Sequence, residues 1–126
     1  MPRFTKLVPI DDWRSTLIQV AKRIGTLDFS IVYRFYSTRY SIPFYVGRSD
    51  TPLVRESTHW SDLDRFHQHR WLGRRISFVD FAIFCGRRRQ RSAFEQECRS
   101  YHYDINNLAN LNHPAGPAKW LCPICQ

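Results

Sequence analysis

The side chains best suited to hold a metal ion lie in the last third of the chain. Cys122 and Cys125 form a C-x₂-C pair, the spacing at which two thiolates hold zinc. Cys98 and His102 are four residues apart, so on a helix they would share one face. Together these pairs predict a structural zinc that fastens the C-terminal tail to the helix, with His113 as an alternative fourth ligand. The competing interpretation is unrelated buried thiols and an exposed pair in the tail.

A second group of side chains suits the hydrolysis of a phosphodiester. That reaction needs a base to activate water, a cation to offset developing charge, and a group that holds the phosphate oxygens. The segment Ser92–His102 offers two carboxylates, Glu95 and Glu97. Successive helical residues are about 100° apart, so only one of the two can point at a site. The other would be an ordinary surface carboxylate.

The charge balance indicates a nucleic-acid partner. The chain has 19 Lys and Arg residues against 11 Asp and Glu, and its net charge is +8. Most of the cations are arginines, whose guanidinium groups bind phosphate oxygens in a two-pronged geometry. We expect backbone contacts from a set of arginines, namely Arg48, Arg74, Arg75, Arg87, Arg88 and Arg89. The run from Arg87 to Arg91, with Arg70, Arg74 and Arg75, is expected to form a basic stripe that meets the phosphate backbone. The alternative is a merely basic protein with a solvated arginine turn.

Hydrophobic periodicity predicts one α+β domain in the 126 residues. Apolar positions three to four residues apart predict a helix from about Asp11 to Ile24, ended by Gly25. Aromatic and β-branched runs predict three strands, the first two forming a hairpin: Phe29–Ser37, Ile42–Gly47 and Ile76–Phe84.

The remaining segments are expected to be helical or irregular. Residues Pro52–Trp71 are predicted to be helical in part, with one face formed by Asp62, Leu63, Phe66 and Trp71. Ser92–Asp104 is predicted to be a helix capped by Ser92, with Glu95 three residues on. The expected fold is a small antiparallel three-stranded sheet flanked by helices. Its core spans about 29–113, with an added N-terminal helix at about 10–25 and a cysteine-containing tail at 114–126.

The sequence predicts a cytoplasmic location. The N-terminal segment MPRFTKLVPIDDW lacks the apolar run of a secretory signal. No stretch approaches the roughly 20 apolar residues that cross a bilayer, so no membrane association is expected. Four cysteines without a secretory signal favour a reducing compartment in which the thiols are free or bound to metal.

Two short motifs on the predicted hairpin resemble those of the GIY-YIG nuclease family. Ile31-Val32-Tyr33 stands for the first motif and Tyr45-Val46-Gly47 for the second, with the tyrosines 12 residues apart. Arg55 follows Gly47 by eight residues, as the arginine of the family's homing endonucleases does, and His59 lies one helical turn later. The first motif departs from the family in having Ser30 or Ile31 in place of its glycine.

The later helix continues the resemblance. Glu97 has Ala93 four residues before it and Tyr101 four after it, similar to the pattern around the family's metal-binding glutamate. Asn112 follows Glu97 by fifteen residues, a spacing similar to that of the family's phosphate-contacting asparagine. These features favour Glu97 over Glu95. The resemblance covers about two thirds of the chain, and the ordered set of residues is more specific than any one motif.

The resemblance implies a mechanism in which each of these residues has a role. Glu97 would bind one Mg²⁺ or Mn²⁺, and Arg55 would hold the scissile phosphate. Tyr33 or Tyr45 would help to activate water, and His59 would relay its proton. Asn112 would orient the phosphate or the glutamate. Arg48, with Arg55, would lower the pKa of the tyrosine that acts as the base. Each also has an ordinary interpretation, because most strand tyrosines simply pack and most arginines are solvated.

The sequence therefore predicts a metal-dependent endonuclease, with DNA favoured over RNA. Specificity is expected to come from a second copy or a protein partner, since the short chain has no separate recognition domain. One rival is a non-catalytic, zinc-containing nucleic-acid-binding module. Another is a protein-interaction domain, for which binding to DNA would lack the steep salt dependence of phosphate contacts.

Overall fold

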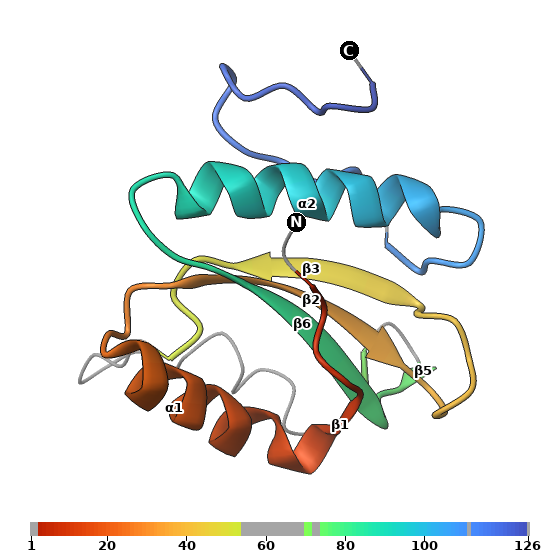
Figure 1. Ribbon diagram of the computed structural model, residues 1–126. Coiled ribbons are helices and arrows are strands. Elements are labelled where there is room, and N and C mark those ends of the chain that lie inside the picture. The colour runs from red at the N-terminus through yellow and green to blue at the C-terminus, as the bar shows by residue number, and fades with distance from the viewer. Residues whose placement is uncertain (1–2, 54–69, 72–73, 111, 126) are drawn as a thin grey trace.

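The computed structural model describes residues 3–53, 70–71, 74–110 and 112–125. The main sheet in this part of the chain is antiparallel, with one helix on each face (Figure 1). Its strand order is β1 (Val8–Pro9), β6 (Phe78–Phe84), β2 (Ser30–Tyr36) and β3 (Tyr45–Ser49). The α+β class and the hairpin are therefore confirmed, and β1 adds a fourth strand to the three expected.

Strand β2 is the centre of the sheet. It pairs with β3 over five residues and with β6 over all seven of its own. Because successive strand residues point to opposite faces, Ile31, Tyr33 and Phe35 point one way and the residues between them point the other. Six of the seven are buried, so both faces of β2 are covered.

Helix α1 (Trp13–Ile24) packs on the face of Ile31 and Phe35, and Trp13 and Leu17 belong to the same buried cluster. Its predicted end is confirmed: Gly25 has a φ of 79°, and its N–H donates to the Ala21 oxygen at 2.9 Å. The predicted start at Asp11 lies instead in a 3₁₀ turn, η1 (Ile10–Asp12). No helix in the described ranges is long and apolar enough to cross a membrane.

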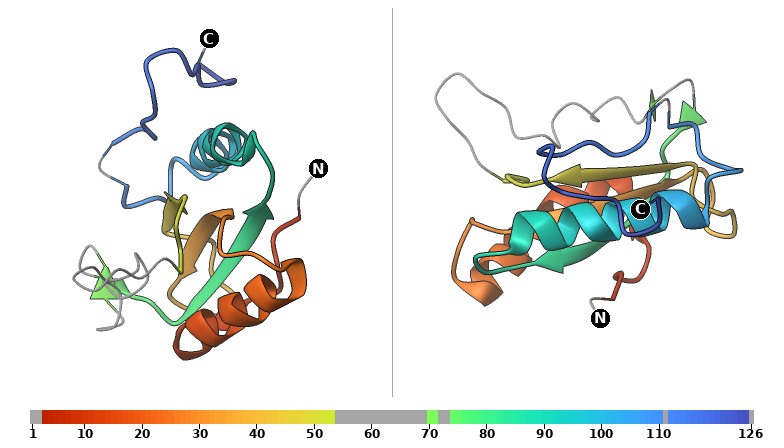
Figure 2. Two further views of the ribbon diagram at one scale, coloured as in Figure 1. Left: turned by 90° about the vertical axis from the view of Figure 1, so that its left-hand side faces the viewer. Right: turned by 90° about the horizontal axis from the view of Figure 1, so that it is seen from above.

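Helix α2 (Arg89–Tyr103) lies across the opposite face of the sheet, as Figure 2 shows from two further directions. The predicted start at Ser92 was wrong. The Ser92 N–H donates to the Arg88 oxygen at 2.9 Å, so Ser92 lies inside the helix and does not cap it. The chain leaves β6 through Gly86, whose φ of 91° allows a tight turn, and the helix begins three residues later.

The segment predicted to be helical at Pro52–Trp71 ends differently from the expectation. Arg70–Trp71 forms strand β4, which pairs antiparallel with strand β5 (Arg74–Arg75). Trp71 is thus in a strand and not on a helix face, because its backbone is paired across a hairpin. The other predicted face residues, Asp62, Leu63 and Phe66, lie outside the described residues.

A buried ion pair holds β2 to β6 on the α2 face. The Arg34 guanidinium donates two hydrogen bonds to Asp80, at 2.9 and 2.6 Å, and the Tyr36 hydroxyl donates a third at 3.0 Å. Burial, with the Asp80 charge, raises the pKa of Tyr36, so its hydroxyl stays protonated. Each charge of this pair is therefore matched.

The β2–β3 pairing predicts the effect of a side chain at Gly47. Gly47 lies opposite Tyr33, and a Cβ there would lie 2.6 Å from Tyr33 Cε2, inside van der Waals contact. We expect Gly47→Ala to lower the free energy of unfolding in urea by about 1–3 kcal/mol. In a Tyr33→Leu background the same change should cost much less, and an equal cost in both backgrounds would exclude the ring as the cause.

Candidate functional site

Two carboxylates and one arginine meet between β3 and α2. Strand alternation directs Arg48 toward α2, where its Nη1 donates to Glu97 Oε1 at 3.3 Å. The Nε atom of Arg48 lies 3.6 Å from Oδ2 of Asp50, just beyond the end of β3. The guanidinium group therefore lies beside both acids, each of which it contacts on one oxygen.

Glu97 is the carboxylate of α2 that points into the molecule. Its side chain is 13% exposed, whereas that of Glu95 is 35% exposed and lies 3.9 Å from Arg91 on the same helix. Burial raises the pKa of Glu97 to about 7, although Arg48 lowers it, and the charge of Asp50 adds to the increase. Strongly shifted carboxylates of this kind are concentrated at functional sites.

Asp50 is a member of this site that the sequence analysis missed. Its Oδ1 is buried and has no hydrogen-bond partner among the described residues. A pattern could have revealed it, because Val46, Arg48 and Asp50 are spaced two apart and so share one face of an extended chain.

The two tyrosines of the predicted site lie on the other face of the sheet. Tyr33 is 5% exposed and packs edge-on against Trp13 of α1, with ring centroids 5.2 Å apart. Tyr45 is half-buried, and its ring lies 6.3 Å from that of Tyr33. The backbone of β3 separates both from Glu97. Arg55 and His59 lie outside the described residues.

A different asparagine from the expected one contacts the sheet. Asn112 is exposed. Asn110 instead accepts a hydrogen bond from the Val46 N–H at 3.1 Å and donates one to the Val46 oxygen at 2.8 Å. Its side-chain amide thus pairs with the backbone of Val46 at the edge of β3, as a residue of a neighbouring strand would. The local sequence is rich in asparagine, and no pattern in it singles out Asn110.

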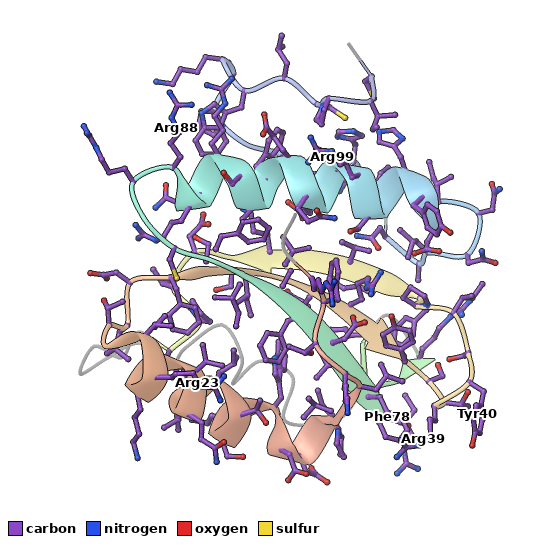
Figure 3. The ribbon with its side chains drawn as sticks, viewed as in Figure 1. Arg23, Arg39, Tyr40, Phe78, Arg88 and Arg99 are labelled. Carbon is purple, nitrogen blue, oxygen red and sulfur yellow. The ribbon has the colours of Figure 1, made fainter. Side chains whose placement is uncertain are left out.

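The arginines do not form the continuous stripe that was predicted. Arg87 and Arg88 are exposed and Arg89 is half-buried at the start of α2. Arg74 and Arg75 are exposed on β5, at the opposite end of the molecule from Arg88 (Figures 1 and 3). The hairpin that contains β5 carries them away from α2, so each group is a separate basic region.

Four ligand atoms of the tail and α2 converge on one point. Those of His102, His113, Cys122 and Cys125, the His/Cys cluster, all lie within 4.8 Å of one another. The Nε2 atoms of the two histidines are 3.1 Å apart, and His102 Nε2 lies 3.5 Å from Cys122 Sγ and 3.2 Å from Cys125 Sγ. This arrangement could bind a metal ion such as zinc.

The fourth member of the cluster is His113 and not Cys98, so the primary prediction of the ligand set is corrected to its alternative. The Cys98 side chain is fully buried beneath the tail and is hydrogen-bonded to Cys122. Burial, followed by that hydrogen bond, raises the pKa of Cys98 to about 12. Although burial opposes it, backbone N–H groups of Cys125 and Ile124 lower the pKa of Cys122 to about 6.

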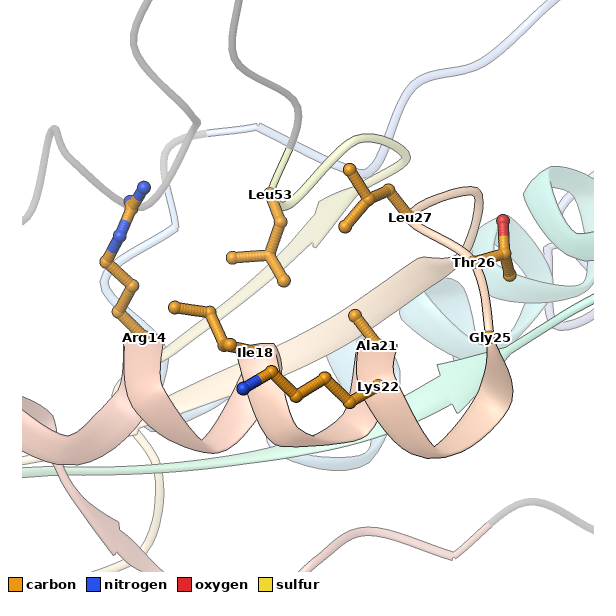
Figure 4. A pocket seen from close by; sticks show the side chains of 8 residues that line it. All are labelled: Arg14, Ile18, Ala21, Lys22, Gly25, Thr26, Leu27 and Leu53. Carbon is orange, nitrogen blue, oxygen red and sulfur yellow. The ribbon is translucent and has the colours of Figure 1, made fainter.

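A hollow of about 720 Å³ lies on the α1 side of the sheet (Figure 4). Its lining is mainly aliphatic, with Ile18, Leu27 and Leu53 facing the cations Arg14 and Lys22. No carboxylate, imidazole or thiol is among its lining residues. It therefore offers no groups for hydrolysis, and the chemistry is concentrated on the α2 side.

In the described chain, one group of side chains, the His/Cys cluster, could hold a metal ion through nitrogen and sulfur. The β3 edge separately brings the carboxylates of Asp50 and Glu97 beside Arg48. Comparisons with protein-family models, curated proteins and solved structures give no significant match.

The pKa of Glu97 predicts how its removal changes stability. Its folded pKa of about 7 lies above the unfolded value of 4.5, so its contribution to stability is present below pH 4.5 and is lost as the pH rises through 7. We expect Glu97→Gln to raise the free energy of unfolding at pH 8, in buffer without divalent ions, by an amount on the order of 2 kcal/mol. The change is measured as a higher melting temperature. At pH 5 the gain should largely vanish. Glu95→Gln is the matched control, and a gain for Glu97→Gln that is independent of pH would contradict the cause given.

Proposed function

We propose that this protein is a metal-dependent endonuclease that hydrolyses nucleic-acid phosphodiesters, with DNA the favoured substrate. The observation that carries the proposal is the buried Glu97 on α2, held against Arg48 on the strand that bears Tyr45-Val46-Gly47. A sheet hairpin followed by a third strand and a helix with an inward glutamate is the arrangement that resemblance to the GIY-YIG family implies.

The residues around Glu97 fit a hard divalent cation. Mg²⁺ and Mn²⁺ prefer oxygen ligands and are commonly held by one or two carboxylates together with water. Glu97 and Asp50 supply such oxygens, and the buried Oδ1 of Asp50 lacks any other partner in the described chain. Glu97 and Asp50 would hold the ion, which when bound supplies positive charge against the oxyanion that leaves. The nitrogen and sulfur donors of the His/Cys cluster suit Zn²⁺ instead, in a structural role.

The protein's own groups orient the phosphate and the attacking water. Arg48 and Arg55 hold non-bridging oxygens of the phosphate, which keeps phosphorus open to attack by water. Of the two tyrosines that the resemblance assigns to water activation, Tyr45 is the more accessible, because it is half-buried whereas Tyr33 is enclosed by the α1 core. Both lie on the face of the sheet opposite Glu97, and we assign acceptance of the water proton to Tyr45. His59 then relays that proton to solvent. As the water oxygen bonds to phosphorus, the bond from phosphorus to the leaving oxygen breaks.

The basic start of α2 supports the choice of nucleic acid as substrate. Three consecutive arginines, Arg87–Arg89, precede or begin the helix, and no acidic residue lies in its first turn. The N-terminal end of a helix also carries partial positive charge, which favours a nearby phosphate. This region contacts the backbone and contributes affinity without sequence information.

The proposal is tested by the cleavage of plasmid and single-stranded DNA in Mg²⁺ or Mn²⁺. We expect the parent chain to cut only with the metal, and Glu97→Gln to cut at least about a thousandfold more slowly while it still binds DNA. Glu95→Gln, on the same helix, should retain the parent rate. If Glu97→Gln and the parent cut equally, the activity comes from elsewhere. If no DNA or RNA is cut but both chains bind it, the protein is a binding module.

The salt dependence of DNA binding tests the basic region. Each phosphate contact contributes about 0.9 to the slope of the logarithm of the binding constant against the logarithm of salt concentration. Arg88→Ala should therefore reduce the slope by about this amount. Arg39→Ala is the control, because Arg39 is exposed at the opposite end of the molecule (Figure 3). Equal slopes for Arg88→Ala and the parent would remove Arg88 from the interface.

A further inference from the structure

The His/Cys cluster has the dimensions of a tetrahedral metal site. With Zn–S bonds of about 2.3 Å and Zn–N bonds of about 2.0–2.1 Å, neighbouring ligand atoms of a tetrahedron are about 3.3–3.8 Å apart. The separations from His102 Nε2 are 3.1, 3.5 and 3.2 Å, and Cys125 Sγ lies 3.6 Å from His113 Nε2. These four separations are close to the tetrahedral values, and all six lie within 4.8 Å, so the atoms surround a common point that a zinc ion could occupy.

Hydrogen bonds orient two of the ligands for metal binding. His113 Nδ1 lies 2.8 Å from the Pro114 oxygen, and a carbonyl oxygen can only accept, so Nδ1 carries the proton. In the neutral ring, Nε2 then presents a lone pair to the cluster. Backbone N–H groups of Ile124 and Cys125 donate to the Cys122 sulfur, as they would to a bound thiolate. Outer hydrogen bonds of this kind are what fix the ligands of protein metal sites.

Much of the described tail is exposed to solvent. Its residues 115–119 are exposed, and an aromatic contact joins Trp120 to Phe94 of α2, with ring centroids 5.6 Å apart. Gly116 fits under that contact, since a Cβ would lie 2.9 Å from the Trp120 ring. One aromatic pair is a small gain against the entropy of ordering a dozen residues, so a bound metal ion would add stability to the tail.

We infer that His102, His113, Cys122 and Cys125 bind a structural Zn²⁺, and that this ion holds Asn110 against the edge of β3. His113 follows Asn110 by three residues, and the Asn110 amide both accepts a hydrogen bond from the Val46 N–H and donates one to the Val46 oxygen. Val46 lies two residues before Arg48, the partner of Glu97. Loss of zinc would therefore loosen the strand that positions Arg48. The consequence for cleavage rests on the proposed function, whereas the zinc site does not.

The ligand set is tested by the metal content of the purified chain and by its Co²⁺ form. We expect one zinc per chain, and a Co²⁺ spectrum with the charge-transfer bands of two thiolates. Cys125→Ser and His113→Gln should lose the metal, whereas Cys98→Ala and the exposed control Cys85→Ser should keep it. Retention by His113→Gln with loss by Cys98→Ala would overturn the assignment of His113. A parent chain that binds neither zinc nor Co²⁺ would overturn the site.

The link to β3 is tested on the parent chain by amide hydrogen exchange with and without a zinc chelator. Removal of zinc should speed exchange of the Val46 amide at least about tenfold, while the Val32 amide in the central strand stays protected. Unchanged protection of Val46 in the zinc-free chain would overturn the link. Neither measurement involves cleavage. A chain that binds zinc but cuts no nucleic acid would therefore refute the proposed nuclease activity and leave the zinc site standing.

Discussion

The central position of β2 governs the rest of the molecule. A strand paired on both sides and covered on both faces must present a different set of side chains to each neighbouring helix. The face toward α1 receives aromatic and aliphatic groups such as Tyr33 and Phe35, and it is dry. The face toward α2 receives Arg34, and the neighbouring strand adds Arg48 to it. Both arginines have carboxylate partners there, so the described ion pairs of β2 and β3 lie on the α2 side of the sheet.

The two ion pairs on that side are built differently. Asp80 accepts two hydrogen bonds from Arg34 and a third from Tyr36. This fully hydrogen-bonded geometry is that of a structural ion pair. Glu97 has one longer contact with Arg48, and Asp50 competes for the same guanidinium. The pKa of Glu97 is correspondingly raised by its burial. An incompletely matched acid at a sheet edge lowers stability, which is the usual cost of a group kept ready for a ligand.

The sequence predicted what depends on local pattern. Aromatic and β-branched runs marked β2 and β6, and Gly25 marked the end of α1, because both follow from backbone preferences of a few residues. The α2 boundary was missed because Arg88 has no capping side chain to mark it. Asn110 and His113 were misjudged because both lie in irregular chain, whose path depends on contacts with residues distant in sequence. Tyr33 and Tyr45 were correctly expected on the two strands of one hairpin. That they lie on the opposite face of the sheet from Glu97 depends on how the helices pack on the sheet, which hydrophobic periodicity does not reveal.

The amide of Asn110 also decides how copies of this chain can associate. Together with the Ala109 N–H, which donates to the Phe44 oxygen at 2.6 Å, it occupies backbone groups along the outer side of β3. At the other border of the sheet, β1 has only two residues and includes Pro9. Both borders are thus blunted against the addition of a foreign strand, the route by which exposed sheets aggregate or exchange segments. Extension of the main sheet from one copy into another is therefore disfavoured at both of its borders.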